Sequence, residues 1–347
     1  MHMADALLSP AVGATFWAGS IAAIGYSSRK LKDVIDDKMI PFMGVLGAFI
    51  FASQMINFTI PGTGSSGHLG GGMILAVLLG PHAAFLVMAS VLTVQALFFA
   101  DGGLLALGCN IWNLGIYPCF IAFPLIYRPL TRGGKNPRRT LLAALLSGMV
   151  GLQLGAFSVV LQTFLSGKSE LPFGTFVLMM QPIHLGIGIV EGLVTAGVIN
   201  YVRSARPELL DSMINGRPLD HGISLKKVLI TLAVAAGITG GVFSWFASTH
   251  PDGLEWSIAK ITGRGELSEH KDGIAGTLHK VQERTAILPE YNFKQNKKDG
   301  EPGTEVPASW PGIETGTSLA GILGALMVLA LSLTIGAGIK ALRKRRS

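Results

Sequence analysis

The chain has 347 residues, of which 49% are hydrophobic and only 14% are charged, and its mean hydropathy is +0.49. Because soluble domains carry roughly a quarter charged residues, this composition excludes an ordinary soluble globule. The net charge of +7 gathers at the ends of apolar runs rather than on one soluble face, so we expect a lipid bilayer as a partner and no nucleic acid.

Apolar runs follow one another along the first part of the chain, and each can cross a bilayer, which takes about 20 residues. They lack the polar face of a soluble helix. The stretch 71–127 is too long for one span, and we expect it to hold three, broken near Pro81 and at 101–103. The sequence therefore predicts a bundle of about seven helices over 8–27, 40–60, three parts of 71–127, 140–165 and 173–202.

A charged linker over 203–227 leads to a second unit over 228–347. This unit holds two apolar spans, 228–248 and 317–339, which are joined by the polar loop 249–315. The predicted fold class is therefore an all-α integral membrane protein, made of the seven-helix bundle and a C-terminal two-helix hairpin.

Clusters of Lys and Arg mark the cytoplasmic ends of membrane spans. If all the clusters are cytoplasmic, the number of spans between them places the N-terminus outside, the C-terminus inside, the linker 203–227 in the cytoplasm and the loop 249–315 outside. We thus predict a multi-pass protein of the cell membrane. The clusters are Arg29, Lys30 and Lys32; Arg128, Arg132, Lys135, Arg138 and Arg139; Arg203, Arg206, Arg217, Lys226 and Lys227; and Lys340, Arg343, Lys344, Arg345 and Arg346.

The first two residues can chelate a metal ion. The start "MHMADALLSPAVG" has no Lys or Arg, so no cleavable signal is expected, and a bulky second residue normally keeps the initiator Met in place. The Met1 amine, the His2 amide nitrogen and an imidazole nitrogen of His2 can then bind one ion through fused small rings. Three nitrogens in a plane suit Ni(II) or Cu(II). A histidine near a chain start is also common by chance.

A second candidate ligand, His68, lies in the segment "GTGSSGHLGGG" over 62–72. Histidine is the commonest metal ligand, and glycine lets the backbone approach a site closely. By itself the segment is more simply interpreted as a flexible loop with an incidental histidine. The predicted topology, however, puts this loop on the same side of the membrane as Met1 and His2, and together they supply four nitrogens.

Several polar side chains interrupt the apolar runs. Ionisable groups inside a membrane are candidates for function, whereas hydrogen bonds between helices explain most Asn and Gln. We expect Gln95, Asn110, Asn113 and Gln181 only to hold helices together. His184 and Glu191 are seven residues apart and share one helical face. We expect them either to support the metal ligands from behind or to form an interhelical pair. The other interrupting residues are Gln54, Asn57 and Asp101.

The remaining histidines and cysteines receive simpler interpretations. Cys109 and Cys119 lie in an apolar run and are expected to be buried, unpaired side chains. His82, beside Pro81, is expected at a helix end, and the histidines expected at the surface are His250, His270 and His279. The chain has no P-loop, HExxH, CxxC or nucleophile elbow, so we expect neither an enzyme nor an ATP site of its own.

Four segments of the sequence resemble a known family. The segments that carry the resemblance are "MHMADALLSP" (1–10), "SSGHLGGG" (65–72), "ADGGLLALGCNIWNLG" (100–115) and "QPIHLGIGIVEGLVTAGV" (181–198). They are similar to the CbiM/NikM family, the substrate-capture subunits of nickel and cobalt energy-coupling-factor transporters. The similarity covers about 1–202. "HPDGLEWSIAKI" (250–261) resembles the PDGLE segment of the small two-span companion subunit, which here is fused over about 225–345.

The resemblance implies a transmembrane coupling subunit and cytoplasmic ATPase subunits as partners, with Met1, His2 and His68 binding Ni2+ or Co2+ as the transported substrate. Family members often begin "MHIPDG", whereas this chain continues with Met3, Ala4 and Asp5, which leaves the ligating positions intact. We expect the region 1–202 to capture the metal, and the fused hairpin to aid transport without supplying a ligand.

Other functions remain open at this point. A self-contained secondary transporter or channel would need charged residues along a path through the membrane, and this chain has few. A metal-dependent membrane enzyme would need an open coordination position and a general base. The sequence does not separate nickel from cobalt, although a planar nitrogen site favours nickel.

Overall fold

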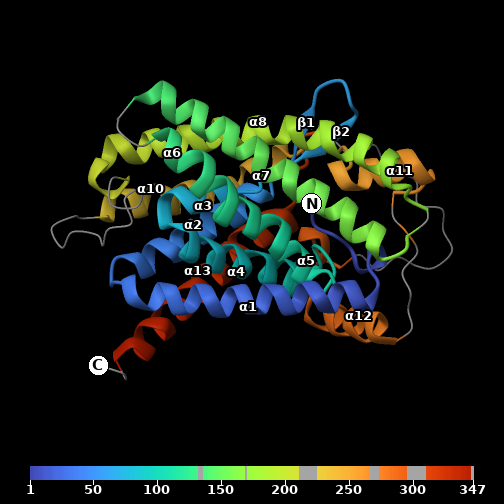
Figure 1. Cartoon of the computed structure of the whole chain (residues 1–347), viewed down its shortest axis with the longest axis horizontal. Helices are drawn as coiled ribbons and strands as arrows, with labels where there is room; N and C mark the ends of the chain where they lie inside the picture. Colours follow the sequence, from blue (N-terminus) through green and yellow to red (C-terminus); the bar gives the residue numbers. More distant parts are fainter. Residues whose placement is uncertain are drawn as a thin grey trace.

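The computed structural model describes residues 1–131, 136–168, 170–210, 225–265, 267, 273–294 and 310–344. Over these residues the chain is a bundle of long helices with a short β-hairpin at one end (Figure 1). The elements of the first part are η1 (Asp5–Leu7), α1 (Pro10–Val34), α2 (Met39–Gln54), β1 (Phe58–Ile60), β2 (Ser65–Gly67), α3 (Gly72–Leu79), α4 (Pro81–Phe99), α5 (Leu107–Ile111), η2 (Trp112–Tyr127), α6 (Arg128–Thr131), α7 (Pro137–Leu165) and α8 (Phe173–Ala205). Those of the second part are α10 (Lys226–Gly241), η3 (Phe243–Phe246), α11 (Gly253–Thr262), α12 (Gly273–Thr285), η4 (Pro289–Tyr291) and α13 (Thr315–Lys344).

The predicted fold class is confirmed, including the two breaks in the middle of the bundle. Gly80 separates α3 from α4, and its φ of 76° is open to glycine without strain. Pro81 then occupies the first turn of α4, where its missing N–H costs nothing. The second break lies between Phe99 and Leu107, and α5, η2 and α6 then follow without interruption.

Five of the described helices are long and apolar enough to cross a membrane: Pro81–Phe99, Leu107–Thr131, Pro137–Leu165, Phe173–Ala205 and Thr315–Arg343. The helix Met39–Gln54 is equally apolar but shorter. Over the predicted span 8–27 the structure has α1, which is longer and less apolar. Over 228–248 it has α10, which ends at Gly241.

Two features predicted around residue 60 were wrong. The span predicted over 40–60 ends at Gln54. The loop that holds His68 is partly a two-stranded antiparallel sheet, in which Phe58 pairs with Gly67 and Ile60 with Ser65. Apolar composition continues through Ile60, so composition alone could not show that the chain leaves the helix. In addition, α3 has only eight residues and reaches about 12 Å, too short to cross a bilayer by itself.

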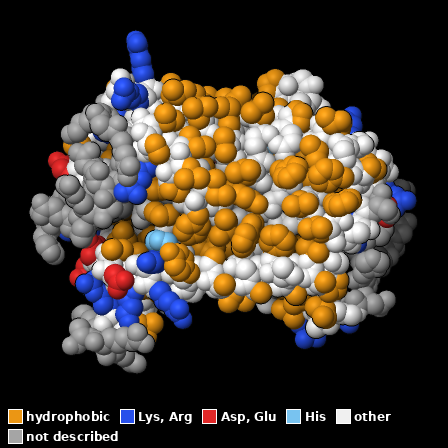
Figure 2. All heavy atoms as spheres, in the orientation of Figure 1, with side chains coloured by type: hydrophobic (Ala, Val, Ile, Leu, Met, Phe, Trp, Pro, Cys, Tyr) orange, Lys and Arg blue, Asp and Glu red, His pale blue; other side chains and the backbone are white. Residues whose placement is uncertain are grey.

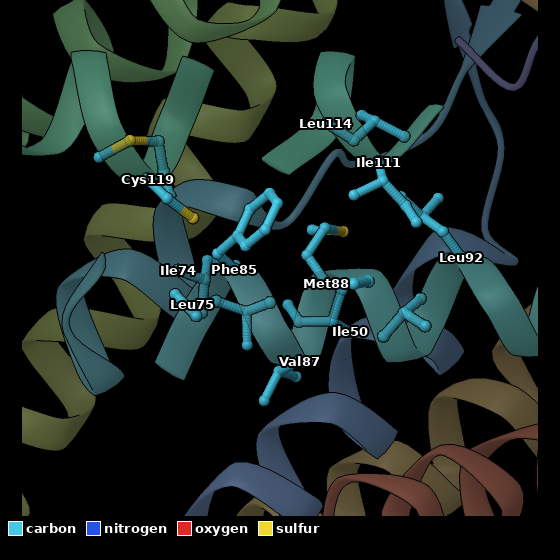
Figure 3. Packing of buried hydrophobic residues seen from close by; sticks show 14 of the residues in the cluster. Ile50, Ile74, Leu75, Phe85, Val87, Met88, Leu92, Ile111, Leu114 and Cys119 are labelled. Atoms are coloured by element: carbon cyan, nitrogen blue, oxygen red, sulfur yellow. The ribbon is translucent and has the colours of Figure 1, made fainter. Parts of the chain in front are cut away.

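The core of the bundle is apolar and closely packed. Phe85 and Met88 of α4 point toward the η2 segment, where Leu114 and Cys119 face them (Figure 3). Both cysteines, Cys119 and Cys109, are buried and free, as predicted.

The outer faces of the long helices are also apolar. Orange side chains form a broad band across the molecule, with Lys and Arg side chains toward its two ends (Figure 2). Large apolar side chains stay exposed on α7, α8, α10 and α13, among them Phe164, Leu178, Val234 and Leu326. So much exposed apolar surface fits hydrocarbon rather than water.

The C-terminal helices pack against the first part of the chain. Gly324 of α13 lies against the ring of Phe51 in α2, and Gly240 of α10 lies against the backbone of Gly321 in α13. Small residues at such crossings let membrane helices approach closely. Helices α11 and α12 lie at one end of the bundle, and the C-terminus lies at the other end (Figure 1).

Candidate metal centre

The first residues of the chain are folded into the bundle. The backbone N–H of Met3 donates to Asn110 Oδ1 at 2.8 Å, and the Met3 carbonyl accepts from the N–H of Gly103 at 2.9 Å. The side chain of Met1 is only 3% exposed. Its sulfur lies against Gly155 of α7, where an added Cβ would come within 3.2 Å of it. The N-terminal amine is therefore held inside the protein.

His2 and His68, two of the predicted ligands, lie together. Their rings stack with centroids 5.0 Å apart and an interplanar angle of 15°. Nδ1 of His2 lies 2.9 Å from Oδ1 of Asp101, and Nε2 of His2 is buried without a hydrogen-bond partner among the described residues. A carboxylate on one ring nitrogen is the usual way to orient a metal-binding histidine.

His68 follows directly on the strand β2. Its Nδ1 lies 3.0 Å from the carbonyl oxygen of Leu69, which leaves Nε2 as the nitrogen available to a ligand. Burial, together with the positive amine of Met1, lowers the pKa of His68 to about 4. The imidazole is therefore neutral near pH 7, which is the form that binds metal ions.

The Met1 amine faces a carboxylate from the other end of the chain. It lies 3.8 Å from Oδ2 of Asp252, which is the aspartate of the PDGLE segment. Burial acts to raise the pKa of Asp252, but the positive amine, the N–H of Glu255 and the two nearby histidines together outweigh burial, so the pKa lies below its ordinary value. Met1, His68, His184 and Asp252 line one pocket.

The proposed chelate is not closed in this geometry. A small ring with the His2 amide nitrogen requires Nδ1 of the same residue, and that atom contacts Asp101 here. The imidazole must turn before Met1 and His2 can bind an ion through fused rings. Among the residues that the structure describes, no three His, Cys, Asp or Glu side chains form a group that could hold a metal ion.

Asp101 also contacts Tyr291, a residue that no motif in the sequence singles out. The hydroxyl of Tyr291 donates to Oδ2 of Asp101, and the Tyr291 ring stacks on Phe99 at 5.1 Å. Burial acts to raise the pKa of Asp101, but His2 and the hydrogen bond from Tyr291 lower it below its ordinary value. Asp252 could have been suspected from its motif, whereas Tyr291 carries no local signal.

His184 and Glu191 share one face of α8, but they do different things. Nδ1 of His184 lies 2.8 Å from the carbonyl oxygen of Met180, and its ring borders the pocket. Both carboxylate oxygens of Glu191 accept from the N–H of Gly71 at 3.0 Å. Glu191 therefore fixes the start of α3, three residues beyond His68.

Of the four polar residues expected only to hold helices together, the two glutamines, Gln181 and Gln95, join helices. Gln181 does so: Gln153 of α7 donates to its carbonyl oxygen at 2.7 Å. Gln95 donates to Gln54 at 2.8 Å, and Gln54 in turn donates to the carbonyl oxygen of Gly70 near His68.

Asn110 and Asn113 contact the N-terminal segment, which the prediction for them missed. Asn113 bonds Gln162 of α7 at 2.9 Å as expected, but its Nδ2 also lies 3.7 Å from the sulfur of Met3. Asn110 was expected only to join helices, and instead it holds the backbone of Met3.

Replacing Asn110 with Ala is therefore expected to weaken metal binding. The change removes two hydrogen bonds of its side chain with the Met3 backbone, each worth about 1 kcal/mol, so affinity should fall by roughly thirtyfold. Gln181→Ala is the matched control, because its side chain lies between α7 and α8 and should leave affinity unchanged. Calorimetric titration of both variants in detergent distinguishes them, and equal affinities would contradict this role for Asn110.

The other histidines are as expected where the structure describes them. His82 is the second residue of α4, His250 is exposed, and His279 lies 3.3 Å from Glu283 on the same helix. His270 lies outside the described residues.

Comparisons with known proteins add to this geometry. Residues 2–209 match the family described as the cobalt uptake substrate-specific transmembrane region, and residues 226–341 match the PDGLE domain. A relative from Rhodobacter capsulatus, named fused nickel transport protein NikMN, is 29% identical and covers 99% of each chain. A cobalt transport protein CbiM from Sorangium cellulosum is 30% identical over 61% of this chain and 96% of its own.

Solved structures give the same result for the first part of the chain. A crystal structure described as a transition metal transporter is 30% identical, covers 60% of this chain and 95% of its own, and superposes with a TM-score of 0.53. A truncated transition metal transporter matches 59% of this chain with a TM-score of 0.52.

Proposed function

This chain belongs to the family of cobalt uptake substrate-specific transmembrane regions with a fused PDGLE domain, and from that premise we propose that it captures Ni(II) or Co(II) outside the cell for an ATP-driven energy-coupling-factor importer. Membership makes it a multi-pass membrane protein of a metal transport family and not an enzyme. The observation that carries the proposal is the stacking of His68 on His2 together with the pocket that His68 lines with Met1, all of them buried or half-buried.

The ligands of the ion are Met1, His2 and His68 in this proposal. The neutral imidazole of His68 offers Nε2, and the amine of Met1 lies in the same pocket. Rotation of the His2 ring away from Asp101 lets Nδ1 join the amine and the amide nitrogen around the ion. Four nitrogens near one plane suit nickel. Two fused relatives are themselves named as nickel transport proteins.

Partner subunits supply the energy in this proposal. The chain has no P-loop of its own, and its family implies a cytoplasmic ATPase and a transmembrane coupling subunit, which drive release in this proposal. The region 1–202 captures the ion, 203–227 serves as a cytoplasmic linker, and 228–347 is the accessory domain with the outer loop 249–315.

The proposed orientation has the N-terminus outside the cell and the C-terminus in the cytoplasm. The ends of the helices support it. Arg343 near the end of α13 donates to the carbonyl oxygen of Ile35, so this arginine lies beside the basic end of α1. Arg203 at the end of α8 donates to Thr140 at the start of α7. Basic clusters thus meet in pairs, as one cytoplasmic face requires.

Labelling of engineered cysteines tests this orientation. A membrane-impermeant thiol reagent applied to whole cells should modify Lys294→Cys, which lies after η4, and should leave Ser347→Cys unmodified until the cells are opened. The native Cys109 and Cys119 are buried and give little background. The reverse pattern would overturn both the orientation and an outward-facing site.

Calorimetric titration of the purified chain with Ni(II) and Co(II) tests the capture function itself. We expect one ion per chain, with nickel bound more tightly than cobalt. Uptake by cells should further require co-expressed coupling and ATPase subunits. Failure to bind either ion would contradict the proposal, and uptake by the chain alone would contradict the energy-coupling-factor assignment.

A further inference from the structure

The fused domain reaches the ion site through the strand that precedes His68. The N–H of Ser66 in β2 donates to the carbonyl oxygen of Pro251 at 2.8 Å, and its hydroxyl donates to that of His250 at the same distance. The N–H of Ser248 donates to the carbonyl oxygen of Asn57, just before β1, at 2.7 Å. These bonds fix the segment 248–252 alongside the hairpin.

Asp252 is oriented by the helix that it begins. Its Oδ1 accepts from the N–H groups of Leu254 and Glu255 at 2.8 Å, and Glu255 accepts from the N–H of Asp252 in return. This capping box leaves Oδ2 free to face the Met1 amine at 3.8 Å. Helix α11 itself is held against α8, because Gly253 lies where an added Cβ would be 2.6 Å from Ile183.

We propose that Asp252 is a positioning residue of the ion site, contributed by the fused domain, which holds the Met1 amine in the pocket and supplies negative charge that favours a divalent cation there. The inference rests on the proposed function, because it takes Met1 as a ligand. Asp252 is not a ligand in this account. Its carboxylate acts across about 4 Å, a distance at which opposite charges interact strongly in a partly buried site.

A second contact shows that the same domain approaches the site from the other side. Tyr291 bonds Asp101, which contacts His2, and Gln282 of α12 donates to the carbonyl oxygens of Ala96 and Gly102 at 2.8 and 2.7 Å. The domain therefore borders the amine of residue 1 as well as the loop that orients residue 2. Removing the whole domain should weaken binding without abolishing it.

Substitution of Asp252 with Asn separates charge from helix capping. Asn caps helices about as well as Asp, so the unfolding temperature in detergent should stay within about 2 °C of wild type. Nickel affinity of the full chain, measured by calorimetry, should nevertheless fall by about tenfold, because one unit charge is lost beside a divalent cation. Asp252→Ala should lower both affinity and unfolding temperature.

The matched control is Glu255→Gln. It removes the same charge from the same helix start, but the Glu255 side chain is exposed and bonds the backbone of Asp252 rather than facing the amine. The nickel affinity of Glu255→Gln should stay within about twofold of wild type, a much smaller change than the loss of about tenfold expected for Asp252→Asn.

The outcomes separate this inference from the proposed function. If wild type binds neither Ni(II) nor Co(II), the proposed function is wrong. If wild type binds nickel and Asp252→Asn binds it equally well, only the role of Asp252 is wrong. Normal affinity in Asp252→Asn with weak binding in Asp252→Ala would assign Asp252 to capping alone and overturn the inference. Equal losses in Asp252→Asn and Glu255→Gln would also overturn it.

Discussion

A chain extended by one residue before Met1 is expected to lose high-affinity nickel binding. The extension converts the amine into a peptide nitrogen and moves the new amine away from His2, so the fused rings cannot form. It must also enter a tightly packed place, because Met1 is 3% exposed and its amine lies 3.8 Å from Asp252. Losing only a residue that orients a metal ligand costs about 10–100-fold in metal affinity. Losing the amine, which is itself a ligand, should therefore cost at least about a hundredfold.

Calorimetric titration checks this expectation. The control is the same residue added after Ser347, beyond the end of α13, which should leave affinity unchanged. His2→Ala and His68→Ala should each reproduce the loss, since each removes an imidazole from the stacked pair. Nickel bound by the N-terminally extended chain as tightly as by wild type would show that the coordination proposed for Met1 is wrong.

Replacing Glu191 with Ala is expected to reduce both folding stability and metal affinity. The carboxylate is buried in the bundle and accepts from the N–H of Gly71 at the start of α3. Without it, that N–H lies inside the protein with no side-chain acceptor, at a cost of about 1–3 kcal/mol. The unfolding temperature should fall by several degrees. Nickel affinity should fall by about tenfold or more, because His68 lies three residues before Gly71 and loses the anchor of its loop.

Two further variants make this result specific. Glu191→Gln keeps an oxygen acceptor for the N–H of Gly71 and should lose less stability and affinity than Glu191→Ala. Gln153→Ala removes a hydrogen bond between α7 and α8 and should lower the unfolding temperature without changing nickel affinity. Thermal unfolding and calorimetry in the same detergent give both quantities. Unchanged affinity in Glu191→Ala would contradict the link between Glu191 and His68.

The helical bundle could be predicted because its signals are local. Apolar runs, the proline at position 81 and the glycines near 101–103 mark where helices run and break, and the structure has its breaks at those places. The hairpin over 58–67 could not be predicted, because its strands are three residues each, the first continues an apolar run and the second lies in a Gly- and Ser-rich segment. Strands this short depend on partners, and Ser66 finds one in Pro251, remote in the sequence.

The candidate site divides in the same way. Met1 and His2 are neighbours in the chain, so their capacity to chelate can be deduced from residue chemistry, and span counting predicts that His68 lies on the same side of the membrane. The roles of Asn110, Glu191, Asp252 and Tyr291 could not be deduced, because a buried polar group is defined by the partner that packing brings to it. Tyr291 and Asp101 are 190 residues apart, and no local pattern encodes their contact. The sequence by itself determined which atoms can bind a metal ion. Only the tertiary structure decided which carboxylates and amides hold those atoms in place, because that depends on which helices lie side by side.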